Sequence, residues 1–591
     1  MEYINHLKLL HNSLNDKTSE KFDARKMRFL KPYLILNWKN ITLSLFLMLV
    51  VSIITLPVPY LTKYIIDSVL PEKDLYLITL IVGIIAALYI IRSLLSLTIN
   101  YLFSKINIGV QISMRRDIFK KILSLPLTFF QQYKSGYLLA RLNEIQSISI
   151  FFSSSMLGLI IDFLEMVFLL VILFMFNVKM TLMVLCFVPI YLIVFKKFKS
   201  GLIKSSRNLL EKTANLSKST QESITGINVI KSFSAEERES LKISKDLKHY
   251  YNAGITQNIF FSTAIELVIL ISSISSLLIL WASMYNIIGG AFTIGMYIAF
   301  ATYSMRFFAP IQKFASASVT IQPAIAALSR VTEIARQIAD DEDNNRKIVL
   351  KRLKGDIEFK NVFFGYEKNN QVLTDINFHI YPGEKVAIVG PSGAGKSTLT
   401  SLILQFYKPQ GGKILFDGID SSKIIMRCIR ERIGLVSQEI FLFDDTIRNN
   451  IKYGNPDADE EEIIRVAKAA NAYDFIQTLP DAFDTIIGER GISLSVGQRQ
   501  RVSIARALIA NPDIYIFDEA TSALDSISQK EIQDFIINTK GKTIIIIAHS
   551  RNTVLLADRI AVLDAGIIEQ FDKASQLMES SDLFNKLFES R

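Results

Sequence analysis

The feature of this sequence that most directly indicates chemistry is a glycine-rich run ending in a lysine and a serine. Gly390–Ser397 has the spacing G-x-x-x-x-G-K-S, follows the apolar residues Val386–Val389 and precedes an apolar stretch that predicts a helix. A strand, a glycine-rich turn and a helix N-terminus direct backbone N–H groups and the positive helix end at one point, which suits phosphate. Lys396 would reach the terminal phosphates, and the Ser397 hydroxyl can bind Mg²⁺. The spacing predicts a nucleoside triphosphate site.

A second motif ends an apolar strand with two carboxylates. Ile514–Phe517 is followed by Asp518 and Glu519. This arrangement would place Asp518 beside Mg²⁺ and Glu519 where it can polarise an attacking water. Because both motifs fall in one α/β pattern, they predict a single site that hydrolyses the triphosphate.

Length and composition indicate more than this one domain. With 591 residues, of which 50% are hydrophobic, the chain is expected to form at least two domains. Its net charge of +10 comes without a base-reading motif, so nucleic acid is not an expected partner. The positive residues crowd the loops between long apolar runs, which indicates membrane topology. Cys186 and Cys428 are not expected to form a disulfide.

The apolar runs before residue 330 are long enough to cross a bilayer, which takes about 20 residues per helix. Asn40–Thr62 contains no charged residue, and Leu267–Met305 has room for two helices with a turn at Gly289 and Gly290. Six membrane-spanning helices are predicted, at about 38–64, 75–103, 152–177, 179–198, 257–284 and 292–317.

The basic residues predict the orientation of these helices. Lys and Arg concentrate in segments 105–148 and 196–255, whereas the connections on the other side hold only Lys73 and Lys179. Positive loops favour the cytoplasm, so both termini and the second half of the chain are predicted to be cytoplasmic, in a multi-pass protein of the plasma membrane. Both basic segments contain little Gly or Pro, which favours helices extending beyond the bilayer over solvated connectors.

Five charged residues within the predicted spans could line a cavity: Arg92, Asp162, Glu165, Glu266 and Arg306. Lipid exposure of such a residue costs about 2.5–3.5 kcal/mol, so these side chains should face the bundle interior. Mutual pairing, for example of Arg92 with an acidic residue, and contact with substrate both remain open. The slight acidic excess of this set would suit a cationic peptide or drug.

These patterns divide the chain into four parts. They are a cytoplasmic N-terminal segment (1–30), a transmembrane domain (31–330), a charged linker (331–354) and a nucleotide-binding domain (355–591). The predicted fold class is multidomain: an all-α polytopic membrane domain with six transmembrane helices extended into the cytoplasm, followed by an α/β Walker-type nucleotide-binding domain.

Several further motifs follow a fixed order along the second half. They are Asn361–Tyr366, the glycine-rich run, Ser437–Gln438, Thr485–Gly491, Leu494–Gln498, Asp518–Glu519, Ser522–Asp525 and His549. With the six spans, this order resembles that of ABC exporter half-transporters over about residues 30–580. The resemblance implies ATP and Mg²⁺ as cofactors and a dimer that holds two ATP molecules between its ATPase domains. The partner would be a second copy of the chain, or a related chain in a heterodimer.

The resemblance also implies a role for each matching residue. Gln438, Glu519 and His549 would be catalytic, and Asp525 would lie at the dimer interface. ATP would contact Tyr366, which would stack on adenine, and Gly390, Pro391, Ser392, Gly393, Ala394, Gly395, Lys396, Ser397 and Thr398. Mg²⁺ would be bound by Ser397, Gln438 and Asp518. The signature residues Leu494, Ser495, Val496, Gly497 and Gln498 would grip the γ-phosphate bound by the other subunit.

The resemblance has one departure in the signature and also predicts which loops of the membrane domain contact the ATPase domain. Val496 replaces the usual second glycine of the signature, although the phosphate-contacting Ser495 and Gly497 remain, so both sites of a homodimer are expected to hydrolyse ATP. The loop tips that dock on the ATPase domain are expected near Phe129–Ser135 and Leu209–Asn215.

The sequence says least about the transported molecule. Gly136–Ile145 resembles the corresponding segment of haemolysin-type and bacteriocin exporters, which favours ATP-driven export of a peptide. The segment before the first span contains no Cys, so the chain is not expected to cleave a leader itself. A lipid flippase or a multidrug exporter is the alternative, and a non-pumping ATP-gated channel is a third reading. Each would leave the spans in contact with membrane lipids.

Overall fold

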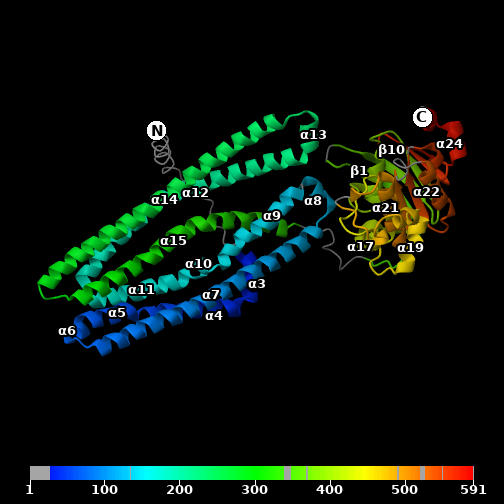
Figure 1. Ribbon diagram of the computed structural model, residues 1–591. Coiled ribbons are helices and arrows are strands. Elements are labelled where there is room, and N and C mark those ends of the chain that lie inside the picture. The colour runs from blue at the N-terminus through cyan, green and yellow to red at the C-terminus, as the bar shows by residue number, and fades with distance from the viewer. Residues whose placement is uncertain are drawn as a thin grey trace. The chain divides into compact units, whose positions relative to one another are not determined.

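The computed structural model describes residues 27–589, apart from 134, 338–347, 368–369, 489–490, 520–525 and 549. It separates into two compact units (Figure 1). The helical unit comprises Met1–Leu123 and Lys134–Gln337, and the α/β unit comprises Ser124–Tyr133 and Ile338–Arg591. The second boundary lies inside the predicted linker, whose first residues continue a helix that ends at Ala335.

The helical unit is built from long helices joined by short turns. Its elements are η1 Arg28–Leu30, α3 Lys31–Leu36, α4 Trp38–Thr55, α5 Pro57–Tyr64, the π-helical segment η2 Ile65–Val69, α6 Leu70–Glu72, α7 Leu75–Leu123, α9 Ser135–Ile148, η3 Ser149–Phe152, α10 Ser154–Leu157, α11 Leu159–Phe176, α12 Val178–Thr225, α13 Ile227–Ser232, α14 Glu236–Ile288 and α15 Ile294–Ala335.

Five stretches of the described chain are long and apolar enough to cross a membrane. They are Trp38–Glu72, Leu75–Leu123, Gly136–Phe176, Val178–Thr225 and Glu236–Ile288. Helix α15, 42 residues long, covers the sixth predicted span. The predicted turn is present, because α14 stops before Gly289 and Gly290 has a positive φ of 71°.

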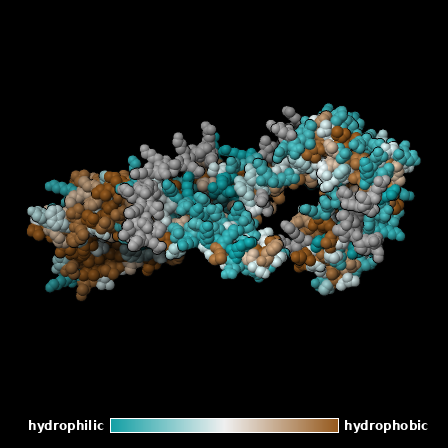
Figure 2. All heavy atoms as spheres, turned by 90° about the horizontal axis from the view of Figure 1, so that it is seen from above, coloured by the Kyte–Doolittle hydropathy of each residue, from teal (hydrophilic) through white to brown (hydrophobic). Residues whose placement is uncertain are grey.

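The basic segments are helical extensions of the spans. Helix α7 continues into the first of them as far as Leu123, and α9 forms its last part. Helices α12 and α14 continue from the membrane into the second and pack along each other. Figure 2 shows the result on the surface: hydrophobic residues gather at the end of the helical unit that carries α5 and α6, and hydrophilic residues cover its other end. The surface of the first end is therefore suited to the interior of a bilayer, and the surface of the second end is suited to contact with water.

Side chains in the helical unit fix the arrangement of its helices. A buried cluster that includes Leu169, Phe300 and Tyr303 packs α11, α12, α14 and α15 together. At the start of α15, the Asp67 carboxylate accepts hydrogen bonds from the Thr293 hydroxyl (2.5 Å) and the Gly295 N–H (2.9 Å), which ties the first span to the last.

The α/β unit combines a parallel sheet, a smaller antiparallel sheet and short helices. Its elements are α8 Leu127–Gln132, β1 Ile357–Phe364, β2 Leu373–Ile380, β3 Lys385–Val389, α16 Lys396–Ile403, β4 Gly411–Phe416, β5 Ile419–Asp420, η5 Ser421–Lys423, α17 Met426–Arg430, β6 Ile433–Val436, α18 Ile447–Lys452, α19 Glu460–Ala469, α20 Tyr473–Gln477, η6 Ala482–Asp484, α21 Val496–Ile509, β7 Ile514–Asp518, α22 Ser526–Asn538, β8 Thr543–Ile547, α23 Arg551–Val554, β9 Arg559–Asp564, β10 Ile567–Asp572, α24 Ala574–Ser580 and α25 Asp582–Glu589.

The order of the larger sheet is β10-β9-β3-β8-β7-β6, and that of the smaller is β2-β1-β4-β5. Strands β9, β3, β8, β7 and β6 run parallel. Side chains such as Ile388 and Ile546 are almost fully buried, as expected for a parallel sheet covered on both faces. Register pairs Ile547 of β8 with both Ile388 and Asp518, so the carboxyl ends of β3, β8 and β7 lie level.

One segment from the first half of the chain belongs to the α/β unit. The residues 124–133 between α7 and α9 contain α8, whose Phe129 is buried. The Gln131 side-chain oxygen accepts a hydrogen bond from the Tyr407 hydroxyl. This confirms a helical tip near the first predicted position, Phe129–Ser135.

The second predicted tip is wrong. Leu209–Asn215 lies in the middle of α12, and the chain turns only at Gly226, where α13 begins. Gly226 ends α12, and its N–H bonds to the Glu222 carbonyl oxygen in the last helical turn. Leu209–Asn215 contains no Gly or Pro that would interrupt the helix, and the chain turns later, at Gly226.

Candidate functional site

The glycine-rich run forms an open turn between β3 and α16. Gly393 and Gly395 have φ angles of 83° and 107°, which residues with a side chain rarely adopt. A Cβ at Gly395 would lie 2.7 Å from a methyl of Leu373. Gly395 is also the N-cap of α16 and offers no side-chain acceptor to the first N–H groups of the helix. These amides are thereby suited to bind phosphate oxygens.

The Lys396 side chain lies in this turn, with 7% of its surface exposed. Its ammonium group donates to the carbonyl oxygens of Gly390 and Pro391, both at 2.9 Å. Burial lowers the pKa of Lys396, and the nearby carboxylates of Glu519 and Asp518 oppose this shift. A cation held among acceptors near two carboxylates can bind the terminal phosphates of a nucleotide, as the motif predicts.

The carboxylates and Gln438 come together at the carboxyl edge of the large sheet. Strand β6 pairs with β7, which places Gln438, two residues beyond Val436, beside the end of β7. The Gln438 amide donates to the Glu519 carboxylate at 2.7 Å. Glu519 has a left-handed backbone with φ of 51°, and its N–H bonds to the Ile547 carbonyl oxygen at 2.9 Å. A non-glycine residue in this conformation is costly and recurs at functional sites.

The residues at this edge fit Mg²⁺ bound together with a nucleotide. The described residues contain no cluster of three His, Cys, Asp or Glu side chains that could hold a metal unaided. Mg²⁺ is commonly bound by one or two protein oxygens together with substrate phosphates and water. Ser397, exposed at the start of α16, Asp518 at the end of β7 and the Gln438 amide oxygen offer such a set.

Tyr366 lies beside the turn with about half of its surface exposed (52%). Its hydroxyl is 3.1 Å from the Thr398 hydroxyl, and its ring meets the Tyr407 ring edge-on at 5.2 Å between centroids. An exposed aromatic face next to the phosphate-binding helix is suited to stack on a base, so stacking on adenine stays a prediction.

The signature residues form a second helix N-terminus. Ser495 is the N-cap of α21, and its hydroxyl accepts from the Gln498 N–H (3.2 Å) while the Gln498 side chain accepts from the Ser495 N–H (2.9 Å). Leu494 is buried, whereas Ser495 and Val496 are exposed and Gly497 is half-buried. Since the Ser495 hydroxyl only accepts within this capping box, its proton is available to a phosphate oxygen.

Three of the predicted features cannot be placed. Asp525 and His549 lie outside the described residues, as do Glu489 and Arg490 of the loop Thr485–Gly491. Their roles stay predictions.

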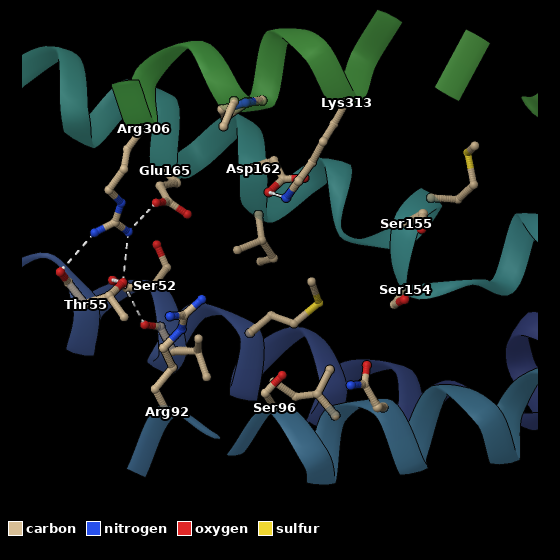
Figure 3. Close-up of a pocket in the computed structure, with 18 of the residues that line it drawn as sticks. Ser52, Thr55, Arg92, Ser96, Ser154, Ser155, Asp162, Glu165, Arg306 and Lys313 are labelled. Carbon is tan, nitrogen blue, oxygen red and sulfur yellow. Dashed lines mark hydrogen bonds and ion pairs between the residues drawn. The ribbon is translucent and has the colours of Figure 1, made fainter. Parts of the chain in front are cut away.

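The helical unit contains a cavity of about 1120 Å³ between α4, α5, α7, α10, α11 and α15. Four of the five predicted charges line it: Arg92, Asp162, Glu165 and Arg306. Arg306 pairs with Glu165 at 2.5 Å and also donates to the Thr55 hydroxyl and carbonyl oxygen (Figure 3). The predicted pairing of Arg92 with either acidic residue does not occur.

Two corrections change the charge balance of this cavity. Glu266 is exposed on α14 and is not among the lining residues. Lys313 does line the cavity and pairs with Asp162 at 2.7 Å. The sequence analysis missed Lys313, although its position seven residues after Arg306 places both on one face of a helix. The lining holds three cations and two anions, so the expected acidic excess is wrong.

The resemblance of Gly136–Ile145 to peptide exporters falls on a structural contact. Within this segment Arg141 pairs with Glu144, and Arg330 of α15 donates from Nε to both Glu144 carboxylate oxygens at 3.0 Å. The Arg330–Glu144 pair fastens α9 to α15. This contact gives the segment a structural role that is independent of the transported molecule.

A bundle of long apolar helices fused to a phosphate-binding α/β unit defines an ATP-dependent membrane transporter. Residues 41–311 match the family model of the ABC transporter transmembrane region, and residues 373–522 match that of the ABC transporter. The chain belongs to the ABC transporter family. It is a membrane-embedded ABC exporter whose transport is coupled to ATP hydrolysis.

The relatives of the chain differ in what they are named for. It is 34% identical to an ATP-dependent lipid A-core flippase of Desulfotalea psychrophila over 92% of this chain and 96% of the relative. It is 33% identical to a leukotoxin translocation ATP-binding protein of Mannheimia haemolytica over 93% of this chain and 78% of that one. The solved structure of a bacterial Atm1-family ABC exporter with ATP bound matches with a TM-score of 0.85 at 26% identity, covering 93% of this chain and 98% of that chain.

Proposed function

We propose that the chain exports an amphipathic molecule across the plasma membrane as a dimer, with its α/β unit in the cytoplasm. The proposal of a dimer rests on one observation: the N-terminus of α21, which includes Ser495, is exposed, and the Ser495 hydroxyl has a proton to donate. A second copy could place its bound nucleotide there. Each nucleotide would then lie between the glycine-rich turn of one copy and the signature of the other.

Each of the side chains described above would have a separate role in ATP hydrolysis. Amides of the turn and Lys396 hold the phosphates, and the Gln438 amide orients Glu519. Glu519 accepts a proton from the attacking water, which is a general-base role. Bound Mg²⁺ would supply charge stabilisation to the phosphates, held by Ser397, Asp518 and Gln438. His549 would hold the γ-phosphate and Asp525 the interface, as the family resemblance implies.

Closure of the dimer would move the membrane helices through the helical tips. Segment 124–133 is part of the α/β unit by its contacts and is continuous with α7 and α9 in the chain. Any displacement of the α/β unit therefore acts directly on those two helices. Nucleotide binding favours the closed pair, and loss of the γ-phosphate contacts removes that preference.

The sequence predicts a peptide as the exported molecule. The acidic cavity that supported this expectation is not present, because its lining carries a cationic excess. A lipid or another amphiphile is thus favoured, and the flippase relative is consistent with that. A peptide remains the second candidate, because a relative of similar identity is named for leukotoxin translocation.

The dimer can be tested by cross-linking through the nucleotide site. Cys186 and Cys428 are first replaced by Ser, and Ser392→Cys and Ser495→Cys are then combined in a Glu519→Gln chain. ATP with Mg²⁺ should produce a disulfide-linked dimer on a non-reducing gel. Ser422→Cys, exposed elsewhere in the α/β unit, replaces Ser495→Cys in the matched control. A purified chain that hydrolyses ATP but remains monomeric would overturn the proposal.

A further inference from the structure

The cavity of the helical unit has a polar side formed by hydroxyl and amide groups. On α7, Arg92, Ser96 and Asn100 recur every four residues and therefore share one helix face. Figure 3 shows Arg92 and Ser96 facing Ser52 and Thr55 of α4 across this space. Ser52, Ser96 and Asn100 on this side offer hydrogen-bond donors, whereas the Thr55 hydroxyl already donates to carbonyl oxygens of its own helix and accepts from Arg306.

The acidic groups of the cavity already have cationic partners. Glu165 is paired with Arg306 and Asp162 with Lys313, and both acidic side chains are mostly buried. Arg92 has no hydrogen bond or ion pair with any residue that the structure describes, and its side chain is exposed to the cavity. The fifth charge of the lining is therefore a cation that no side chain of the described chain neutralises.

A cation at this depth is a functional group by default, because an unpaired charge within a span is unfavourable. Guanidinium binds carboxylate and phosphate through two parallel hydrogen bonds, and neighbouring hydroxyls can complete the shell of an oxyanion. The lining also includes apolar side chains, among them Met48, Val51, Val58, Ile99 and Ile161. The region of the cavity around Arg92 is thus suited to bind an anion, and apolar side chains lie beside it.

We propose that Arg92 binds the acidic head group of the exported molecule, and that this molecule is an anionic, lipid-like amphiphile. The inference rests on the proposed export function and specifies its substrate class. An apolar chain would lie along the apolar lining, and the head group would lie between α7 and α4. Substrate would neutralise Arg92, which the protein itself leaves without a counter-charge.

The test compares amphiphiles that differ only in their head group. The chain in nanodiscs of zwitterionic lipid is titrated with a long-chain alkyl phosphate, the matched alkylphosphocholine and the matched alkyltrimethylammonium, and binding is measured by equilibrium dialysis. The alkyl phosphate should bind at least about tenfold more tightly than the other two, as expected for one charge-assisted contact. Inorganic phosphate should not compete at the same concentration.

Variants at one helix position distinguish Arg92 from general surface charge. Arg92→Gln should remove the preference for the alkyl phosphate, and Arg92→Lys should retain most of it. Arg116→Gln, on the same helix but outside the cavity lining, is the matched control and should bind as the unmodified chain does. Circular dichroism and size exclusion report whether each variant is folded.

Three results would overturn the proposal: equal binding of all three amphiphiles, full competition by inorganic phosphate, or tighter binding of a cationic peptide that Arg92→Gln does not change. ATP hydrolysis of the same samples is measured in parallel. Hydrolysis with no head-group preference would refute this inference alone. Absence of hydrolysis would instead refute the proposed export function.

Discussion

The nucleotide site and the membrane cavity are built in opposite ways. Lys396, Gln438 and Glu519 follow strands whose register places their ends side by side, so short motifs in the sequence become neighbours in space. The cavity takes its charges from α7, α11 and α15, and only helix packing decides which of them meet. Local motifs therefore predict the residues of the nucleotide site, whereas the positions of the cavity charges along the sequence do not show which of them form ion pairs. The two sites should also respond differently to the loss of one side chain.

The largest effect is expected at the nucleotide site. Glu519→Gln removes the general base but keeps an acceptor for the Gln438 amide, so ATP should still bind while its turnover falls by about 10²–10⁴-fold. Phosphate release and binding of a fluorescent ATP analogue measure the two quantities. Glu431→Gln, exposed in an ion pair with Arg427, is the control and should leave both unchanged. Normal turnover in Glu519→Gln would refute the assignment.

In the cavity, the loss of one carboxylate should lower the stability of the fold. It should not slow a particular chemical step. Glu165→Gln keeps an acceptor for the Arg306 guanidinium but removes its counter-charge, in a position about a quarter exposed. The expected cost is about 1–1.5 kcal/mol, because a hydrogen bond between two charged groups is replaced by one to a neutral acceptor. Thermal unfolding in detergent should show a lower midpoint.

The double variant Glu165→Gln with Arg306→Gln provides the control for that prediction. Removing both charges leaves no unpaired guanidinium at position 306, so part of the loss should be recovered. A midpoint in Glu165→Gln equal to that of the unmodified chain would mean that this ion pair contributes nothing to the fold.

The different accuracy of prediction in the two halves has a physical cause. Phosphate binding needs a fixed spacing of glycine, lysine and serine, so Gly390–Ser397 could be assigned from the sequence alone. The membrane spans were visible because apolar length is a local property, although α7, α12 and α14 extend further than the apolar runs. The structure confirms that the basic segments are helical.

Contacts between distant segments could not be predicted from the sequence. The pairing of Arg306 with Glu165 joins residues far apart in the chain, and several pairings satisfied the same composition. The turn at Gly226 lies in a stretch that mixes Ile and Val with polar residues, so the hydropathy pattern does not mark it. The contact between Gln131 and Tyr407 joins parts of the chain that share no pattern.

The contact between Gln131 and Tyr407 can be used to test whether the nucleotide site depends on the segment 124–133, which is distant in the sequence. Tyr407→Phe removes the hydroxyl that donates to Gln131 and keeps the ring that packs on Tyr366. The KM for ATP should change less than about twofold, while turnover should fall up to about fivefold, as for one net hydrogen bond. Burial raises the pKa of Tyr407, so the hydroxyl stays protonated and the effect should not vary with pH near neutrality.

Tyr407→Ala and Gln131→Ala complete the comparison. Tyr407→Ala also removes the ring beside Tyr366, and its KM for ATP should rise. Gln131→Ala should resemble Tyr407→Phe, and combining these two should add little, because both remove the same contact. Additive losses would show that the two side chains act separately.

The smallest effect is expected at the position where the chain departs from the family signature. Val496 is the first residue of α21, and its side chain is 46% exposed. Val496→Gly should leave the capping box between Ser495 and Gln498 in place, since that box uses neither the Val496 side chain nor its N–H. ATP turnover should change less than about twofold, because Gly lowers helix stability by less than about 1 kcal/mol. A tenfold rise would instead show that the Val496 side chain obstructs the partner's phosphate, and that this helix end, unlike the glycine-rich turn, could not be judged from its motif.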